Sequence, residues 1–488
     1  MAKVSPPQRL PGVYHDVRSV IRHLPHIPSR GRVMAMIELD WYEENRVIDI
    51  HAREWLSDYG LHKLGMTSTP EHLPANMSVN MLMAGAEVGL IFPQNTGGVR
   101  AVAQMSEGSV TVTYEASKLG AAGNRLSISV LERDGAYEVV EFFDSDIISR
   151  QQVESLHQLR PMRMVRPIFD IQEGYDFEQD GPIALPLGQV KLEGGHSGSL
   201  PAYNTRQGAF QSAAALEYWD TIAFGIEPNI TGYQSAINSH AAWLNQLNAD
   251  LGEARASFVF AIHEGDTVAM EQIQKHFEYS PTTVGLSMDN SEIINVSDIA
   301  HFDGQLARPS QMVLFWAGLH AGTPANEEMT VQRDLLNRLT GLATRRNIRQ
   351  RESLMNRGFF ILDQDVEGVI SIVRGVTSFV HTHLTKNIQW TDERTGRVRH
   401  AWMKSINQMF TRYAKNHLMD TDEDMTTWRI MVHDKAELFV SQRLLQDHEI
   451  GKISVRPNGH KSWETRYDGF IIPMTVDTLD MVTRIGFR

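Results

Sequence analysis

The distribution of apolar residues along the chain predicts a layered α/β fold on either side of a central segment of different character. Short apolar runs at 33–39 and 87–93 have the length of buried strands, and helical patterns lie near 52–58 and 77–85. The same alternation returns later as helices at 206–217, 233–250 and 267–277 and strands at 219–226, 256–262 and 282–288. Such alternation implies parallel crossovers and a sheet covered on both faces.

The segment 97–188 interrupts this alternation with a pattern typical of antiparallel β structure. β-branched and aromatic residues alternate or cluster at 109–116, 125–132 and 136–143. The stretch 160–182 lacks this pattern and is expected to form a long loop or linker. We therefore predict that a β domain, 97–188, is inserted into one α/β domain formed by 31–96 and 189–344.

The two ends of the chain differ from the rest. Residues 1–30 carry five prolines and little apolar periodicity, which predicts an extended arm. A C-terminal domain, 345–488, begins at an arginine-rich stretch, 345–357. We expect it to contain strands at 358–364, 368–376, 468–476 and 480–487 and helices at 401–418 and 435–446. The predicted fold class is therefore multidomain α/β, with an inserted β domain, an α+β C-terminal domain and extended N- and C-terminal arms.

Composition narrows the classes of function. The formal net charge of −13 does not favour nucleic acid or an anionic membrane as a partner. No stretch approaches 18 consecutive apolar residues, and the first residues lack the apolar core of a secretory signal. Because the chain has no cysteine, disulfides, zinc thiolate sites and cysteine nucleophiles are excluded. We expect no cofactor, no nucleic-acid partner and no membrane insertion.

The stretch 195–199, GHSGS, is reminiscent of a hydrolase nucleophile loop because glycines flank Ser197. The nucleophile elbow requires Gly-x-Ser-x-Gly directly between a strand and a helix, and here the last position is Ser199. The chain then continues as a loop through Pro201. We expect these glycines to permit tight turns where the chain re-enters the α/β domain, with catalysis at Ser197 as the alternative.

Two further groups are candidates for chemistry. His263, Glu264 and Asp266 follow a predicted strand at its carboxyl end, where α/β folds place ligand sites. Polar residues are also needed there to begin a loop and cap the next helix, and we favour that structural role. His381 and His383 share one face of an extended segment as a candidate metal pair. No third ligand is evident, so we favour their interpretation as surface histidines.

The clearest periodic element is the helix expected at 401–418. Its apolar face carries Trp402, Ile406, Met409, Phe410 and Tyr413. The opposite face is basic and polar, with Lys404, Gln408, Thr411, Arg412 and Lys415. A basic stripe is usually a solvated face, but on a chain of net charge −13 it is also a docking surface for an acidic partner. The acidic run 420–424 either neutralises this face or forms a separate patch.

The termini combine a proline-rich arm with apolar strand-like segments. An exposed apolar edge strand invites pairing with another chain, by strand addition. The alternative is that both termini pack on their own domain, and the termini by themselves favour neither interpretation.

Five motifs, in order over nearly the whole length, resemble the subtilisin-like tail sheath family of contractile phage tails and related injection machines. The matching stretches are LPGVY (10–14), NTGGVRAVAQ (95–104), YEASKLGAAGNRLSISV (114–130), LEGGHSGSL (192–200) and WAGLHAGTPANEEMT (316–330). The fourth is similar to the family's Leu-x-Gly-Gly-x-x-Gly signature, in which Ser197 falls at a variable position. The C-terminal third, ending in FIIPMTVDTLDMVTRIGF, resembles the family's closing domain.

The resemblance implies a structural protein and not an enzyme. Sheath subunits form hexameric rings that stack helically around an inner tube and contract to drive the tube through the host envelope. The implied partners are further copies of this chain, the inner tail tube protein, and baseplate and tail terminator proteins. The implied location is the virion, after assembly in the host cytoplasm. A tailocin or other contractile injection system would share these mechanics, and an α/β hydrolase using Ser197 or His263 is the alternative from another class.

The resemblance also assigns residues. The arms of one sheath subunit add strands to the C-terminal domains of its neighbours, which here implicates Pro11, Gly12, Val13, Tyr14, Phe470, Ile471 and Ile472. Tube contact in the family comes from the C-terminal domain, so we predict that Lys404, Arg412 and Lys415 face an acidic tube. The inserted domain, 97–188, is expected to project outwards, and the central fold to resemble subtilisin without the protease's triad.

Overall fold

The computed structural model divides the chain into two compact units. The larger contains the described residues up to Lys404, and the smaller contains most of those from Ser405 onward. The structure describes residues 31–66, 73–108, 110–169, 181–227, 233–251, 255–260, 292–329, 332–379, 391–413, 422–445, 453–457, 463–471 and 479–487. None of the helices in these ranges is long and apolar enough to cross a membrane.

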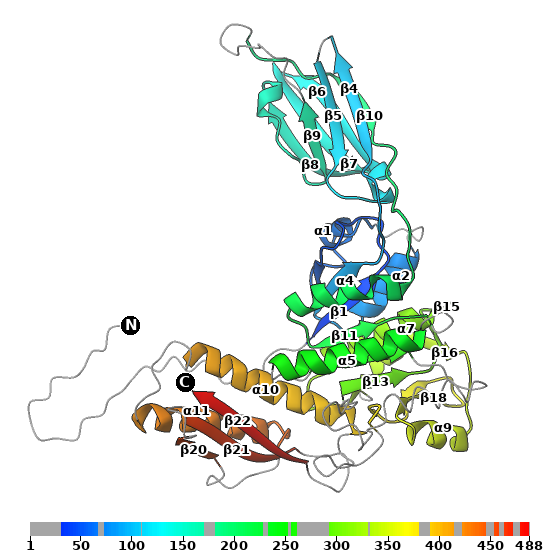
Figure 1. Ribbon diagram of the computed structural model, residues 1–488. Coiled ribbons are helices and arrows are strands. Elements are labelled where there is room, and N and C mark those ends of the chain that lie inside the picture. The colour runs from blue at the N-terminus through cyan, green and yellow to red at the C-terminus, as the bar shows by residue number, and fades with distance from the viewer. Residues whose placement is uncertain are drawn as a thin grey trace, which may run out of the picture. The chain divides into compact units, whose positions relative to one another are not determined.

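The larger unit is built on a seven-stranded sheet in the order β17-β13-β12-β11-β1-β3-β2 (Figure 1). Its strands are β1 (Arg32–Ile37), β2 (Ile48–His51), β3 (Val88–Pro93), β11 (Thr221–Phe224), β12 (Ala256–Phe260), β13 (Ile293–Val296) and β17 (Phe359–Phe360). All neighbours are parallel except β2, which pairs antiparallel with β3. The predicted parallel α/β architecture is confirmed. β17 joins this sheet although it follows position 345, and the division into domains remains a prediction.

Helices cover both faces of the sheet. They are α2 (Leu73–Met83) and α7 (Pro309–Gly322) on one face and α4 (Tyr203–Leu216) and α5 (Tyr233–Leu251) on the other. Successive side chains of β1 point to opposite faces, so Val33 and Ala35 pack with α2 and α7, whereas Met34 and Met36 pack with α4 and α5. The helix expected at 52–58 is wrong: α1 spans Asp58–Lys63 and begins where Ser57 accepts a hydrogen bond from the Gly60 N–H.

Glycines allow α2 and α7 to approach each other closely. A Cβ atom added to Gly318 would lie 2.2 Å from the carbonyl oxygen of Leu82, and one added to Gly322 would lie 1.7 Å from that of Gly85. These two glycines are the ones in the stretch WAGLHAG. That motif therefore has a packing role, since any side chain would separate the two helices.

The β domain consists of two antiparallel sheets that enclose their own core (Figure 1). One has the order β10-β6-β7-β8, and the other β4-β5-β9. The strands are β4 (Val102–Glu107), β5 (Val110–Ala116), β6 (Leu126–Arg133), β7 (Ala136–Phe143), β8 (Asp146–Val153), β9 (Val165–Phe169) and β10 (Gly188–Lys191). The three predicted strands are confirmed. The expected loop at 160–182 is wrong in part, because β9 pairs with β5 within it.

Short sheets and helices complete the larger unit. They are β14 (Ala300–Phe302), β15 (Gln305–Leu306), β16 (Leu339–Leu342), β18 (Leu362–Gln364), β19 (Ile370–Ile372), α8 (Arg333–Leu336) and α9 (Ile348–Met355). β14 pairs with β15 and β16, and β18 pairs with β19 as a hairpin. The single strand expected at 358–364 is therefore two strands, β17 and β18, in different sheets.

The smaller unit combines helices with an antiparallel sheet. Its elements are the end of α10 (Glu393–Tyr413), α11 (Asp422–Ser441), β20 (Ile453–Pro457), β21 (Trp463–Ile471) and β22 (Leu479–Phe487). The Phe410 ring meets the Trp428 ring edge-on, with centroids 6.2 Å apart. The helix expected at 435–446 begins much earlier, at Asp422, because acidic residues are favourable in the first turn of a helix.

Candidate functional site

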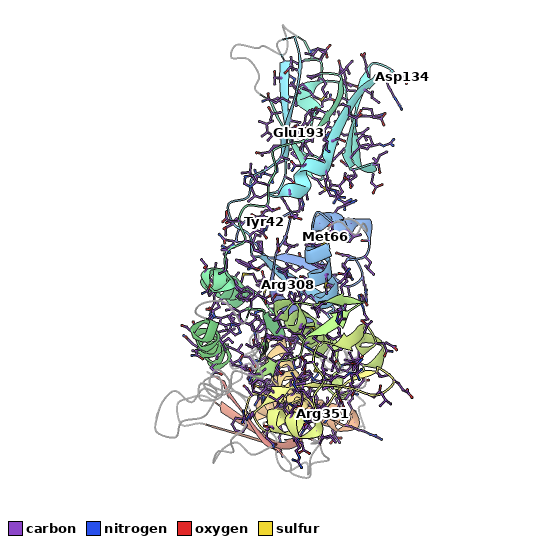
Figure 2. The ribbon with its side chains drawn as sticks, turned by 90° about the vertical axis from the view of Figure 1, so that its right-hand side faces the viewer. Tyr42, Met66, Asp134, Glu193, Arg308 and Arg351 are labelled. Carbon is purple, nitrogen blue, oxygen red and sulfur yellow. The ribbon has the colours of Figure 1, made fainter. Side chains whose placement is uncertain are left out.

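The glycine-rich loop 192–200 forms the junction between the β domain and the central sheet. The chain leaves the sheet after β3 and returns beside its own path, with bridges between Thr96 and Ser199 and between Val99 and His196. The Tyr42 hydroxyl, at the same junction (Figure 2), donates a hydrogen bond to the carbonyl oxygen of Ser197 at 3.0 Å. The loop therefore connects the two antiparallel sheets of the β segment to the central sheet.

The hydroxyl of Ser197 is engaged in this junction. It donates a hydrogen bond to Oδ1 of Asp40 at 2.6 Å and accepts one from the backbone N–H of Ala121 at 3.1 Å. The neighbouring imidazole of His196 accepts a hydrogen bond from the Gly198 N–H through Nδ1. In the described part of the chain, no imidazole is hydrogen-bonded to Ser197. A serine nucleophile needs such a base, so the arrangement is that of a structural serine.

Glycine is required at this junction on steric grounds. Gly198 has φ +74°, and a Cβ atom there would lie 2.1 Å from the carbonyl oxygen of Thr96. Gly120 has φ +126°, and its Cβ atom would lie 1.9 Å from the carbonyl oxygen of Asp40. Positive φ and close backbone approach both favour glycine. The prediction that the glycines of the loop 192–200 permit tight turns is confirmed at Gly198.

The other candidate residues for catalysis or metal binding lie outside the described residues. These are His263, Glu264, Asp266, His381 and His383. Among the residues that the structure describes, no group of three or more His, Asp or Glu side chains is arranged to hold a metal ion.

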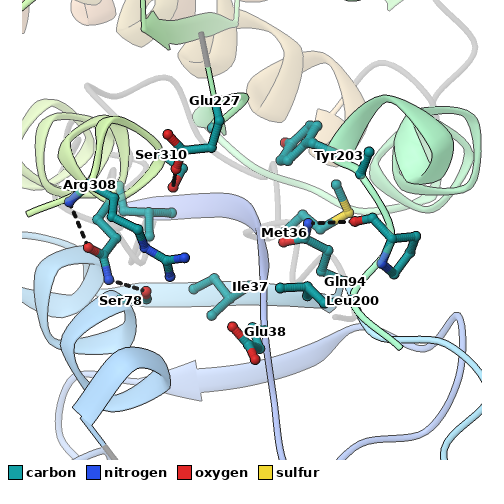
Figure 3. Close-up of a pocket in the computed structure, with 15 residues that line it drawn as sticks. Met36, Ile37, Glu38, Ser78, Gln94, Leu200, Tyr203, Glu227, Arg308 and Ser310 are labelled. Carbon is teal, nitrogen blue, oxygen red and sulfur yellow. Dashed lines mark hydrogen bonds between the residues drawn. The ribbon is translucent and has the colours of Figure 1, made fainter. Parts of the chain in front are cut away.

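A pocket of about 210 Å³ opens at the carboxyl ends of β1, β3 and β11, where parallel sheets place ligand sites (Figure 3). Several of its polar side chains bond to one another or to the backbone. Gln311 donates to the Ser78 hydroxyl at 3.2 Å, Gln94 donates to the carbonyl oxygen of Pro201 at 3.1 Å, and Ser310 donates to Glu227. Ser310 therefore lies beside a carboxylate, but no imidazole lines the pocket among the described residues.

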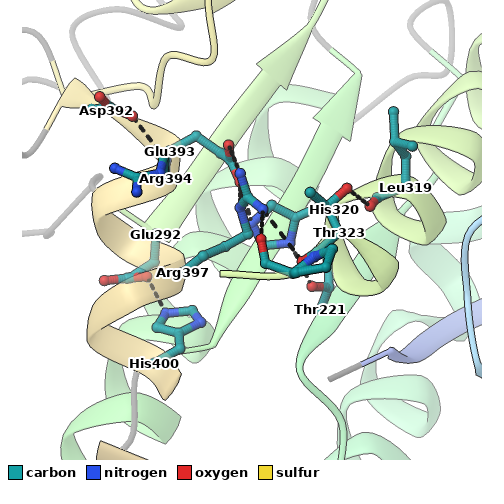
Figure 4. A network of polar contacts seen from close by, with 11 residues as sticks. Thr221, Glu292, Leu319, His320, Thr323, Asp392, Glu393, Arg394, Arg397 and His400 are labelled. Carbon is teal, nitrogen blue, oxygen red and sulfur yellow. Dashed lines mark hydrogen bonds and ion pairs between the residues drawn. The ribbon is translucent and has the colours of Figure 1, made fainter. Parts of the chain in front are cut away.

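A buried polar network, not anticipated from the sequence, holds the first half of α10 within the larger unit (Figure 4). Glu393 contacts Nε2 of His320 at 2.9 Å and forms an ion pair with Arg397 one turn later. Burial raises the pKa of Glu393, but the charges of Arg397 and His320 outweigh it and hold the pKa at about 2. Nδ1 of His320 lies 2.8 Å from the Thr221 hydroxyl of β11. The network thereby links α10 and α7 to the central sheet.

The same helix makes further buried contacts along its length. His400 lies 2.8 Å from Oε2 of Glu292, which also pairs with Arg399. Asp392, immediately before the helix, accepts a hydrogen bond from the Arg394 N–H. Burial and the charge of Glu393 raise the pKa of Asp392 to about 6. The available sequence signal was the i, i+4 spacing of Glu393 and Arg397, which lies before the helix start expected at 401.

The three residues predicted to face a tube have different surroundings. Nζ of Lys404 lies 3.1 Å from Oδ1 of Asp220 and 4.7 Å from the centre of the Tyr218 ring, and its side chain is only 11% exposed. Arg412 is exposed, and Lys415 lies outside the described residues. Lys404 is therefore held within the larger unit, and the contact of these residues with a tube remains a prediction.

The residues predicted for strand exchange fall only partly within the described residues. Phe470 and Ile471 belong to β21, whereas Pro11, Gly12, Val13, Tyr14 and Ile472 are outside them. β21 is the middle strand of the sheet β20-β21-β22. An added strand would therefore pair with β20 or β22, since both sides of β21 already have partners. Strand exchange remains a prediction.

Comparison with known proteins identifies the class of this fold. No model of a known protein family matches the sequence. The structure is similar to the sheath tail protein Lin1278 from Listeria innocua, with a TM-score of 0.75 and 16% identity over 94% of this chain and 95% of that chain. It is also similar to a sheath tail protein, DSY3957, from Desulfitobacterium hafniense, with a TM-score of 0.70 and 16% identity over 97% and 100% of the two chains. The chain thus has the fold of sheath tail proteins, and the predicted resemblance and α/β fold class are confirmed.

A sequence relative matches at similar coverage. The chain is 22% identical to the uncharacterized protein YqbK of Bacillus subtilis over 508 aligned positions, which cover 98% of this chain and 96% of that protein.

Proposed function

We propose that this protein is the structural subunit of a contractile tail sheath. Its copies would form stacked hexameric rings around an inner tube, and contraction of the stack would drive the tube through a host cell envelope. The observation that carries this proposal is the similarity of fold to two sheath tail proteins over at least 94% of the chain.

Assembly from identical subunits fits the chemistry of the chain. Head-to-tail contacts that do not close on themselves generate helical polymers. The sequence carries no phosphate-cradling glycine-rich motif, so the energy of contraction would be stored in contacts between subunits of the extended form. Strand addition at the edges of the β20–β22 sheet by the arms of neighbouring copies would connect the subunits.

The proposal extends to partners and location. The inner tail tube protein would line the channel, and baseplate and tail terminator proteins would bound the stack. In a phage, the sheath would belong to the virion and assemble in the host cytoplasm. A tailocin or another contractile injection system is the alternative within this class, because the mechanics are shared.

An α/β hydrolase is the less favoured function. The hydroxyl of Ser197 is bound to Asp40 and Ala121, so its catalytic use would require the domain junction to open. We propose that the protein is not an enzyme.

Negative-stain electron microscopy of the purified full-length chain tests the proposed function. Striated hollow tubes or stacked rings are the expected result, and deletion of residues 1–20 should abolish them. If the chain alone gives no polymer, co-expression with an inner tail tube protein supplies the template. Failure to polymerise in its presence, together with esterase or peptidase activity lost in Ser197→Ala, would favour the hydrolase.

A further inference from the structure

The sheet β10-β6-β7-β8 has one face in the core of the β domain and one face outside it (Figure 1). Leu126, Ile128 and Val130 of β6 are buried in that core. Successive side chains of a strand point to opposite faces, so Ser127 and Ser129 lie on the outer face. Residues directly opposite each other in antiparallel strands share a face. The strand register therefore determines which side chains are neighbours there.

A row of three different chemical groups crosses this outer face. Lys191 of β10 is opposite Ser127 of β6, which is in turn opposite Phe142 of β7. Gln189 of β10, opposite Ser129, lies on the same face next to this row. Lys191 and Gln189 are exposed, and Phe142 is partly exposed. An ammonium group, a hydroxyl group and an aromatic ring thus follow one another across the sheet, with an amide beside them.

A hollow of about 410 Å³ opens on this face, and only polar residues line it. They are Arg125, Ser127, Asp144, Gln189 and Lys191. Nε of Arg125 donates to Oδ1 and Oδ2 of Asp144, at 3.0 and 3.1 Å, which holds the guanidinium and the carboxylate in place. Among the residues that the structure describes, the side chains of Gln189 and Lys191 form no hydrogen bond or ion pair. These two groups are therefore available to a ligand.

This set of groups matches the chemistry of a sugar. Sugar hydroxyls both donate and accept hydrogen bonds, and the hollow offers a carboxylate that accepts, an ammonium that donates and an amide that does both. The flat ring of Phe142 offers an apolar surface for the C–H groups of a pyranose ring. Arg125 is paired with Asp144, so Lys191 leaves the hollow with a net positive charge. A sugar that carries an acidic group is therefore the best complement.

We propose that this hollow, named the saccharide hollow, binds an acidic sugar unit of a polysaccharide. Lys191 would pair with the sugar carboxylate, Gln189 and Asp144 would bind hydroxyl groups, and Phe142 would pack against the ring. The volume lies within the range of about 300–1,000 Å³ that is usual for small-molecule sites. The proposal goes beyond the sheath function, because polymerisation of identical subunits requires no saccharide and the hollow is not part of the β20–β22 sheet.

Saturation-transfer difference NMR with the full chain tests this site, because the method detects weak binding to a large protein. The probes are a galacturonic acid hexamer and the same hexamer with every carboxylate methyl-esterified. The wild type should bind the acid form about tenfold more tightly than the ester, since only the acid can pair with Lys191. Lys191→Gln should remove this preference by weakening binding of the acid form about tenfold. Lys191→Arg should preserve it, because the positive charge remains.

Two further variants separate the ring from the charge. Phe142→Ala should weaken binding of both probes to a similar extent, because the contact with the ring does not involve the carboxylate. Arg166→Gln is the matched charge control and should change neither affinity. Arg166 is an exposed cation of β9, and it lies on the outer face of the other sheet because its neighbour Val165 points into the core. Thermal unfolding of each variant verifies that folding is intact.

Three results would overturn the saccharide hollow. They are no saturation transfer to either probe at millimolar concentration, unchanged binding of the acid form by Lys191→Gln, and displacement of the hexamer by an equal concentration of sodium acetate, which would indicate a site for any anion. Electron microscopy of the same samples tests the sheath separately. Tubes built by a chain that binds no hexamer count against the hollow alone, whereas the expected binding in a chain that never polymerises supports the hollow and counts against the sheath.

Discussion

Nε2 of His320 lies 2.9 Å from Oε1 of Glu393, in a contact that joins α7 to α10 inside the protein. The two side chains are 2% and 3% exposed, and Arg397 lies against the same carboxylate. Removing one member of a buried ion pair is far more destabilising than replacing the whole pair by apolar residues, because the charge of the remaining partner is left buried without compensation. The stability of the larger unit should therefore depend on this cluster.

Glu393→Gln should lower the free energy of unfolding by about 3–5 kcal/mol, since Arg397 would remain buried with an uncharged neighbour. Urea denaturation followed by circular dichroism measures the change. Glu437→Gln on α11, where the carboxylate is half exposed, is the control and should shift stability by less than about 0.5 kcal/mol. Equal effects at the two positions would contradict the role of the cluster.

The stability of the protein should fall as the pH rises past the raised pKa of Asp392. Its pKa is about 6 in the folded protein against an ordinary value of 3.8, so its contribution to stability is complete below about pH 4 and is lost as the pH rises through 6. Asp392→Asn should therefore be more stable than the wild type by about 1–3 kcal/mol at pH 7.5, with the difference vanishing near pH 4. Urea titrations at several pH values test this, with exposed Asp146→Asn as control; a pH-independent difference would refute it.

Gly322→Ala should destabilise the protein by about 1–3 kcal/mol, because its methyl group would force α2 away from α7. Gly208→Ala is the matched control. Gly208 also lies within a helix, α4, and a Cβ atom there meets nothing within 4 Å. This second substitution should stabilise the protein by about 0.5–1 kcal/mol. Thermal unfolding of both variants measures the difference, and similar melting temperatures would show that α2 and α7 tolerate separation.

Ser197→Ala should weaken the domain junction, and it should not change any hydrolytic activity of the purified protein. It removes the hydrogen bond to Asp40 and should cost about 1–3 kcal/mol at this site. Hydrogen exchange of the amides of Thr96, Val99 and Ala121 should accelerate, because these amides bond across the junction. Ser199→Ala should leave this exchange nearly unchanged, because among the described residues the Ser199 hydroxyl is hydrogen-bonded to the Thr96 hydroxyl alone. An esterase activity that is present in the wild type and lost in Ser197→Ala would instead favour the hydrolase function.

The strands that the sequence locates best are those in which nearly every residue is buried. β3 and β12 are buried along their whole lengths, and β1 is buried at every residue after Arg32, so their apolar runs are sufficient to locate them. β9 was missed because it contains Pro167 and shows alternating exposure on only five residues. Proline is typical of edge strands, and β9 pairs only with β5 among the described strands.

The polar network around α10 could not be predicted from the sequence, for a different reason. His320, Glu292 and Glu393 are far apart in the sequence, and only the packing of α7 and α10 on the sheet brings charged groups together. Lys404 shows a second limit, since helical periodicity places it on a basic face but does not reveal that Asp220 and the Tyr218 ring contact its ammonium group. Periodicity describes one helix alone and does not include the neighbouring residues that cover its polar face.

The path of the chain at the β domain junction has a consequence for how this protein can vary. The outgoing and returning segments are bridged to each other at Thr96–Ser199, Val99–His196 and Val102–Glu193, so the whole domain leaves and re-enters the sheet at one place. A module attached in this way can be exchanged, enlarged or replaced by a short hairpin without moving either strand that it connects. Related chains are thus free to differ in the length and chemistry of this segment while keeping a common framework, and the same point is a natural position for grafting a foreign domain.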